Sequence, residues 1–155
     1  MFLFVEALAG WRKVNITDRR TRSDWAEQIR ELVDVHYPGV ERITLVMDNL
    51  NTHHVSSPYE AFPPAEARRL MEKLEIVNTP KHGSWLNVAE IELGVLNRPC
   101  MGERIGEKSE RVEKTRPWER GRNGTTAKID WQFTTADAPI KLRRLYPKLQ
   151  VQSEH

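Results

Sequence analysis

Two polar stretches of the chain carry groups that could bind a metal ion or a phosphate. In the first, Asp48 and Asn49 directly follow the apolar run ITLVM (residues 43–47), and His53 and His54 lie a few residues further on. A carboxylate at the end of a buried strand lies where open α/β sheets place their active sites. The same residue could equally cap the strand through an Asx turn, and the two histidines could simply be exposed.

The second stretch is TPKHGSWLNVAEIEL, residues 79–93. Lys81 and His82 could contact a phosphate or belong to a solvated loop. Glu90 falls in the first turn of a predicted helix, where a carboxylate can be held toward a metal or can act only as a cap. At about 100° per residue, Glu92 falls inside the apolar arc of that helix and Glu90 falls opposite it. Periodicity alone predicts a buried Glu92 and a solvated Glu90, and it leaves open which of them faces a site.

The elements that would position these groups alternate along the chain. We expect strands at 2–8 and 12–17 around the turn Ala9-Gly10, a helix over 23–37, a strand at 43–47, a helix over 64–74, a strand at 75–79 and a helix over 88–98. This order predicts an α/β fold with a mixed sheet. The uninterrupted apolar run at 43–47 is typical of a strand that is covered on both faces.

The last third of the chain is basic. From Arg98 onward there are 13 Lys/Arg against 8 Asp/Glu, a net charge of +5, whereas the whole chain carries +2. Residues 103–124 predict a long exposed helix that ends near Gly121 and Gly124 and is interrupted by Pro117. The charge hints at a polyanionic partner, and a solvated helical surface is the alternative. We divide the chain into a core, 1–100, and a basic, mainly helical extension of the same domain, 101–155.

The composition excludes several classes of protein. The 155 residues suffice for one domain, and five tryptophans argue against a disordered chain. The chain has no apolar run near the ~20 residues of a membrane helix, so no membrane partner is expected. Cys100 is the only cysteine, which excludes a disulfide framework and fits a reducing cytoplasm.

Taken together, LVMDNLNTH (45–53) and EIVNTPKHGSWLNVAEIEL (75–93) resemble the catalytic blocks of DDE-superfamily transposases. The match is to the bacterial insertion-sequence group related to Tc/mariner elements. The resemblance extends over nearly the whole chain, through FVEALAGWRKVNITDRRT, YEAFPPAEARRLMEKLEI and WQFTTADAPIKLRRLYP. It implies a ribonuclease-H-like mixed sheet flanked by helices, DNA as the partner, and a place in the bacterial cytoplasm at the nucleoid.

The resemblance also implies which residues act. Asp48 takes the place of the second acidic ligand and Glu90 that of the third, in the family pattern Leu-Asn-x-x-Glu that here runs from Leu86 to Glu90. Such carboxylates bind two Mg²⁺ or Mn²⁺ ions, which activate the attacking water or 3′-hydroxyl and stabilise the leaving oxygen of a DNA phosphodiester. Supporting or DNA-contacting roles fall to Asn49, His53, Lys81, His82, Trp85 and Asn87.

The chain departs from the family pattern at its start. The first acidic ligand and the first, central strand have no counterpart upstream of FLFVEAL, and neither Glu6 nor Asp18 matches that motif. We therefore expect the C-terminal part of a transposase, inactive alone, with unpaired strand edges that call for the missing N-terminal part or other transposase subunits. The alternative is a non-catalytic, transposase-derived DNA-binding or regulatory protein.

Overall fold

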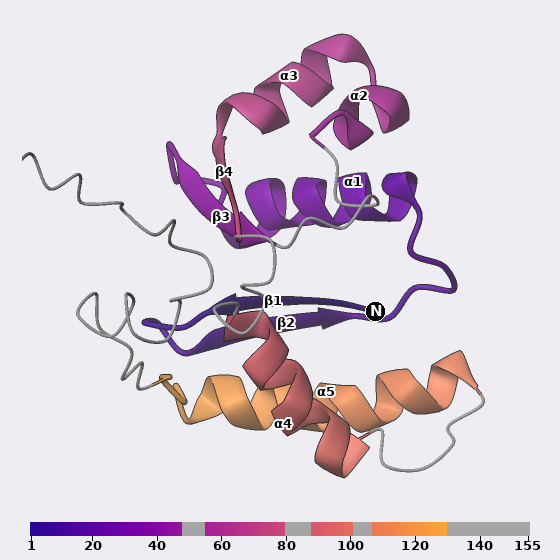
Figure 1. Ribbon diagram of the computed structural model, residues 1–155, viewed down its shortest axis with the longest axis vertical. Helices are drawn as coiled ribbons and strands as arrows, with labels where there is room; N and C mark the ends of the chain where they lie inside the picture. The colour runs from indigo at the N-terminus through magenta and orange to yellow at the C-terminus, as the bar shows by residue number, and fades with distance from the viewer. Residues whose placement is uncertain (48–54, 80–87, 101–106, 130–155) are drawn as a thin grey trace, which may run out of the picture.

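The computed structural model describes residues 1–47, 55–79, 88–100 and 107–129. The element order is β1 (Phe2–Glu6), β2 (Trp11–Asn15), α1 (Arg22–Glu31), the π-helix η1 (Leu32–His36), β3 (Ile43–Met47), α2 (Ser57–Ala61), α3 (Pro64–Glu72), β4 (Leu74–Asn78), α4 (Val88–Cys100) and α5 (Lys108–Gly124). The predicted α/β class is confirmed. Helices α1–α3 lie on one side of the β1–β2 hairpin, and α4 and α5 lie on the other (Figure 1).

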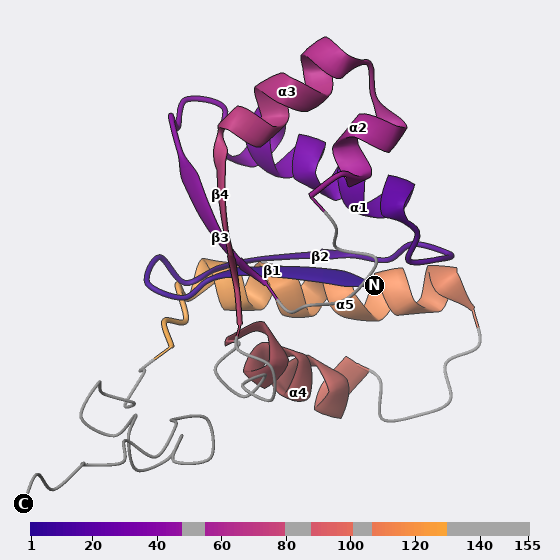
Figure 2. The ribbon, with the colours of Figure 1, turned by 45° about the horizontal axis from the view of Figure 1, so that its top comes forward.

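The predicted hairpin is present. β1 and β2 pair antiparallel, with Phe2 opposite Asn15 and Glu6 opposite Trp11. Because side chains alternate across a strand, Phe2 and Phe4 point to the α1 side, while Leu3 on β1 and Val14 on β2 point to the α4 side. The hairpin is therefore the central layer between two groups of helices (Figure 2).

Gly10 makes the hairpin turn possible. Its φ of 72° lies in the left-handed region, and a Cβ there would stand 2.5 Å from the carbonyl carbon of Thr126. We expect Gly10→Ala to lower the free energy of unfolding by about 1–3 kcal/mol, through backbone strain and this clash. Urea denaturation measures the loss. Gly94→Ala is the control, because nothing lies within 4 Å of that position and alanine favours a helix. Equal stability of the two variants would contradict this account of the turn.

Helix α1 begins with a capping box. The backbone N–H of Asp24 donates to the Thr21 hydroxyl (3.1 Å), and the Thr21 backbone N–H donates to the Asp24 carboxylate (2.8 Å). These reciprocal bonds satisfy donors that the first turn of a helix otherwise leaves open. The bonds from Thr21 also hold the pKa of Asp24 below its usual value of 3.8.

This lowered pKa predicts a pH dependence. A carboxylate whose pKa is depressed by folding stabilises the protein above its unfolded pKa, and that stability disappears as the pH falls through the folded pKa. We expect Asp24→Ala to lower the free energy of unfolding by about 0.3–1 kcal/mol at pH 7 and by progressively less as the pH is lowered below 3.8. Urea titrations of both proteins from pH 7 to pH 2 measure the difference. A gap that does not shrink in acid would rule out the capping carboxylate as its source.

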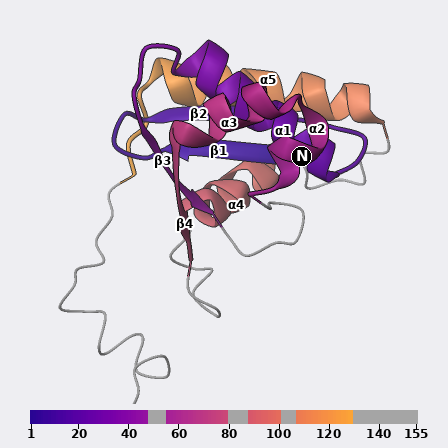
Figure 3. The same ribbon diagram turned by 90° about the horizontal axis from the view of Figure 1, so that it is seen from above.

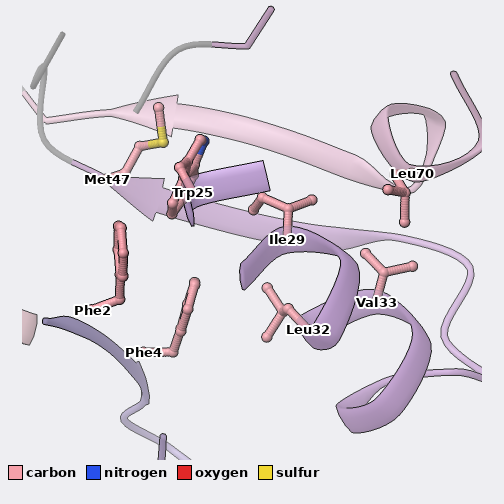
Figure 4. Packing of buried hydrophobic residues seen from close by; sticks show 8 residues of the cluster. All are labelled: Phe2, Phe4, Trp25, Ile29, Leu32, Val33, Met47 and Leu70. Atoms are coloured by element: carbon pink, nitrogen blue, oxygen red, sulfur yellow. The ribbon is translucent and has the colours of Figure 1, made fainter. Parts of the chain in front are cut away.

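One apolar core joins both pairs of strands to α1. It is formed by Phe2, Phe4, Trp25, Ile29, Leu32, Val33, Met47 and Leu70. The Phe4 ring stacks on Trp25 with centroids 6.1 Å apart. Figure 4 shows the two phenylalanines of β1 and Met47 of β3 gathered around the Trp25 ring. The periodic face predicted for residues 23–37 is thus the face that is buried, although the helix widens into a π-turn over its last five residues.

The strand at 43–47 forms as predicted, but the expectation that both of its faces are covered is wrong for the described residues. β3 pairs parallel with β4, Ile43 opposite Leu74 and Met47 opposite Asn78. Met47 faces the core, whereas Val46 and Val77 on the outer face remain 53% and 43% exposed. An apolar run fixes the strand, but only the packing of other elements decides how many of its faces are buried.

Within the described ranges, the strands form two separate two-stranded sheets and not the single mixed sheet that we expected. Figure 3 shows the two pairs running in different directions. Arg12 directs its backbone N–H and C=O away from β1, to Asn123, so its partner Val5 directs its own backbone groups to the opposite edge. In β3, Ile43 N–H and Met47 C=O bond to the β4 side, so Thr44 and Val46 turn theirs away. No described residue pairs with these edges of β1 and β3.

Helix α5 runs without a break from Lys108 to Gly124, so the prediction that Pro117 interrupts it is wrong. Proline removes one helical hydrogen bond, but Pro117 lies on the exposed side of the helix. The opposite side is docked: Thr115 is buried, and Trp118 packs against the cluster of Val14, Leu96 and Cys100. The expectation of a wholly exposed helix is therefore also wrong, because one side of α5 is packed against the hairpin and α4.

None of the helices within the described ranges is long and apolar enough to cross a membrane.

Candidate active site

The carboxyl ends of β3 and β4 meet at one edge. The Thr79 N–H donates to the Met47 C=O at 2.9 Å, so the two parallel strands end side by side. Asp48 is the next residue after Met47 in the sequence. An edge of this kind is where loops that follow parallel strands can converge on a ligand.

Most predicted site residues lie outside the described residues. They are Asp48, Asn49, His53, Lys81, His82, Trp85 and Asn87. Glu90 is the one candidate that the structure places. Two parts of the predicted site therefore lie within the described residues: the end of β3, which precedes Asp48, and the first turn of α4, which carries Glu90.

Glu90 and Glu92 occupy opposite sides of α4. Glu92, Leu96 and Cys100 form a stripe at four-residue spacing that is buried against the hairpin. Glu92 is only 1% exposed, whereas Glu90 is exposed to solvent. The periodicity argument is right for both carboxylates. It fails for Ile91 and Val95, which belong to the apolar arc yet remain substantially exposed.

Glu92 is held by two arginines from other elements. Arg12 of β2 donates from Nε to Oε2 (3.1 Å) and from Nη2 to Oε1 (3.0 Å), and Arg122 of α5 donates from Nη2 to Oε1 (2.6 Å). Burial alone would raise the pKa of Glu92, but the hydrogen bonds and positive charges of the two arginines outweigh it and hold that pKa below its usual range. Glu92 is thus an ionised carboxylate that is fully engaged in the interior and turned away from solvent.

Helix α5 supplies further contacts that the sequence analysis missed. The side chain of Asn123 accepts from the Arg12 N–H and donates to the Arg12 C=O, both at 2.8 Å, and the Glu119 carboxylate accepts from the Val14 N–H at 2.6 Å. These side chains occupy the edge of β2 in place of another strand. One signal was available in the sequence. Arg12 and Val14 are two residues apart and so share one face of their strand, where a buried arginine needs an acidic partner.

The donor set can be compared with the needs of a divalent ion. Mg²⁺ and Mn²⁺ prefer carboxylate oxygens, and the Glu90 carboxylate takes part in no ion pair with another described residue. Glu92 is buried, and both of its oxygens already accept hydrogen bonds from arginine. Within the described ranges, no group of three or more His, Cys, Asp or Glu side chains could hold an ion. Of the two carboxylates in the first half of α4, only Glu90 is exposed and outside an ion pair with another described residue.

A family model described as DDE superfamily endonuclease matches residues 1–113. The match covers β1 through the start of α5 and so includes the end of β3 and the whole of α4. Comparisons with curated proteins and with solved structures gave no significant match.

Proposed function

The chain belongs to the DDE superfamily of endonucleases, and from that premise we propose that it is the C-terminal part of a transposase that cleaves and joins DNA strands. The proposed relatives are the bacterial insertion-sequence transposases of the Tc/mariner group, and the proposed fold is ribonuclease-H-like. α5 is tied to β2 by the side chains of Glu119 and Asn123, which supports treating the basic segment 101–155 as part of the same domain.

One observation carries the assignment of the acidic residues. α4 buries Glu92 between two arginines and leaves Glu90 exposed in its first turn. Of the two candidates, only Glu90 is therefore available to an ion, and Asp48 follows the strand that ends beside β4. We assign Asp48 and Glu90 as metal ligands, with Asn49, His53, Lys81, His82, Trp85 and Asn87 around the site. Two bound Mg²⁺ or Mn²⁺ ions would supply the activation of the nucleophile and the stabilisation of the leaving oxygen.

The open strand edges support a partner polypeptide. Val5 on β1, and Thr44 and Val46 on β3, direct backbone donors and acceptors to edges that no described residue covers. Both strands contribute to the same core around Trp25. A strand that joined these edges would satisfy the open groups and could bring a further acidic ligand. The proposed sources are the N-terminal part of the transposase or another of its subunits.

Plasmid nicking in Mg²⁺ tests the proposal in two parallel reactions. One contains the chain alone, and the other contains the chain together with the polypeptide encoded immediately upstream of the Met1 codon. We expect nicking only in the second reaction, and its loss on Asp48→Ala. Metal-dependent nicking by the chain alone would contradict the need for a partner strand.

A second candidate function has its own support. Arg116 and Arg120 lie one turn apart on the exposed side of α5 and have no ion-pair partner among the described residues. Such a pair suits contact with phosphates, and the net charge of +5 from Arg98 onward agrees with it. Salt-dependent DNA binding with no cleavage in either reaction would favour a non-catalytic DNA-binding or regulatory protein.

A further inference from the structure

We propose that the buried triad Arg12–Glu92–Arg122 is a positioning device that fixes the rotation of α4 and thereby the direction of Glu90. The inference rests on the proposed function in one respect, because it takes Glu90 to be a metal ligand. The triad joins β2 to α4 and α5, two helices that lie far from β2 in the sequence.

The triad constrains the rotation of α4 about its own axis in a way that the apolar contacts of this helix do not. Leu96 and Cys100 pack against the hairpin, and the hydrophobic contribution of such contacts is non-directional. The two parallel bonds from Arg12 to both oxygens of Glu92 have a defined plane and length. Since Glu90 lies about 200° around the helix from Glu92, holding Glu92 inward turns Glu90 outward.

The base of this device is itself fixed. The backbone N–H and C=O of Arg12 are both bonded to the Asn123 side chain, at 2.8 Å each, so the arginine projects from an immobilised strand. Asn123 directly follows Arg122, the other arginine of the triad. One end of α5 therefore holds both the strand that carries Arg12 and the carboxylate that Arg12 binds.

The triad leaves polar groups unsatisfied, which argues against a purely stabilising role. Arg12 is completely buried, and its Nη1 has no hydrogen-bond partner among the described residues. The buried Nε of Arg122 has none among them either. A buried donor without an acceptor is costly, and apolar side chains of similar volume often stabilise a protein as well as a buried ion pair does. What an apolar pair cannot supply is the directional bond between β2 and α4.

The test replaces the ionic pair by an apolar one and follows the position of residue 90. Spin labels are attached at Glu27→Cys on α1 and Glu90→Cys on α4, both exposed, while Cys100 stays buried with a thiol whose pKa is raised by that burial. A quarter-turn of α4 would move a label at its surface by about 7 Å. We expect a narrow distance distribution in the labelled parent and a shifted or much broader one in R12M/E92L. R68M/E72L, which removes an exposed ion pair on α3, is the matched control and should leave the distribution unchanged.

An unchanged distribution in R12M/E92L would overturn the proposal. If that variant does not fold, R12K decides the same question, because lysine keeps the charge but cannot form the fork. Mn²⁺ titration followed by electron paramagnetic resonance, on proteins that retain Glu90, adds a functional readout: we expect about tenfold weaker binding in R12M/E92L. Mn²⁺ binding in the parent that ignores Asp48→Ala and Glu90→Gln would refute the metal site, while the label distances would still decide the positioning role.

Discussion

Replacing Arg12 by methionine is expected to lower the free energy of unfolding by about 3–5 kcal/mol, among the largest effects of any single substitution in this chain. Glu92 would remain buried with only Arg122, whose side chain is 30% exposed, to balance its charge. The double variant R12M/E92L should recover most of the loss, because it removes the buried charge together with its partner. Urea denaturation of the two variants and the parent protein measures both effects.

An exposed ion pair gives the control for this prediction. Arg68 and Glu72 form an i,i+4 pair on α3 with side chains 76% and 64% exposed. Both charges remain solvated and screened, so the pair contributes little and Arg68→Met should hardly change the free energy of unfolding. If Arg12→Met lowered the free energy of unfolding as little as Arg68→Met does, Glu92 would not be buried among its arginines in solution.

The triad also predicts how the stability of the parent depends on pH. The folded pKa of Glu92 lies below its usual value of 4.5. Its ion pairs therefore stabilise the protein fully above that value, and the contribution is lost as the pH falls through the folded pKa. The difference in stability between the parent and R12M/E92L should shift in favour of the double variant as the pH is lowered from 7 to 3.

Glu90→Gln is expected to reduce metal-dependent DNA cleavage by about a thousandfold in the reaction that contains the partner polypeptide. A metal-bound carboxylate helps to hold ions whose stabilisation of the transition state is worth several kcal/mol, and each 1.36 kcal/mol corresponds to about tenfold in rate. Glutamine keeps the size of the side chain but supplies a neutral and weaker ligand. Stability should hardly change, since Glu90 is exposed.

Two variants make the assignment of Glu90 specific. Glu113→Gln, on the exposed surface of α5, should leave the cleavage rate unchanged. Glu92→Gln leaves two arginines with a neutral partner, so it should lower stability and, through the direction of Glu90, reduce cleavage far less than Glu90→Gln does. If instead a folded Glu92→Gln protein lost cleavage completely while Glu90→Gln retained it, the two carboxylates would have been assigned the wrong way round.

Local patterns were sufficient for much of the fold. The hairpin with its Gly10 turn, the strand over Ile43–Met47 and the start of α4 at Val88 all follow from alternation, turn residues and periodicity. The buried Glu92 and the exposed Glu90 follow from the same periodicity. The short helix α2 was missed, since five residues that begin SPY present no period to detect.

The candidate site was only partly predictable. The resemblance of the blocks around Asp48 and Glu90 gave the family, and the family match over residues 1–113 agrees with it. Spacing along one helix could not decide between Glu90 and Glu92, because the answer depends on which side of α4 faces another element. Arg12 and Arg122, which lie 80 and 30 residues from Glu92 in the sequence, hold Glu92 in the interior. The role of Glu90 as a metal ligand stays a prediction.

The α/β class and the position of most elements could be predicted from the sequence, because they depend on near neighbours in the chain, and the family could be predicted from two sequence blocks. Three features appear only in the three-dimensional structure: the described strands form two sheets with open edges, α5 continues through Pro117 to cover β2, and Glu92 binds arginines in the interior. Each of these depends on groups brought together from distant parts of the chain. Their pairing is set by the burial of charge and of backbone polar groups, which no local pattern records.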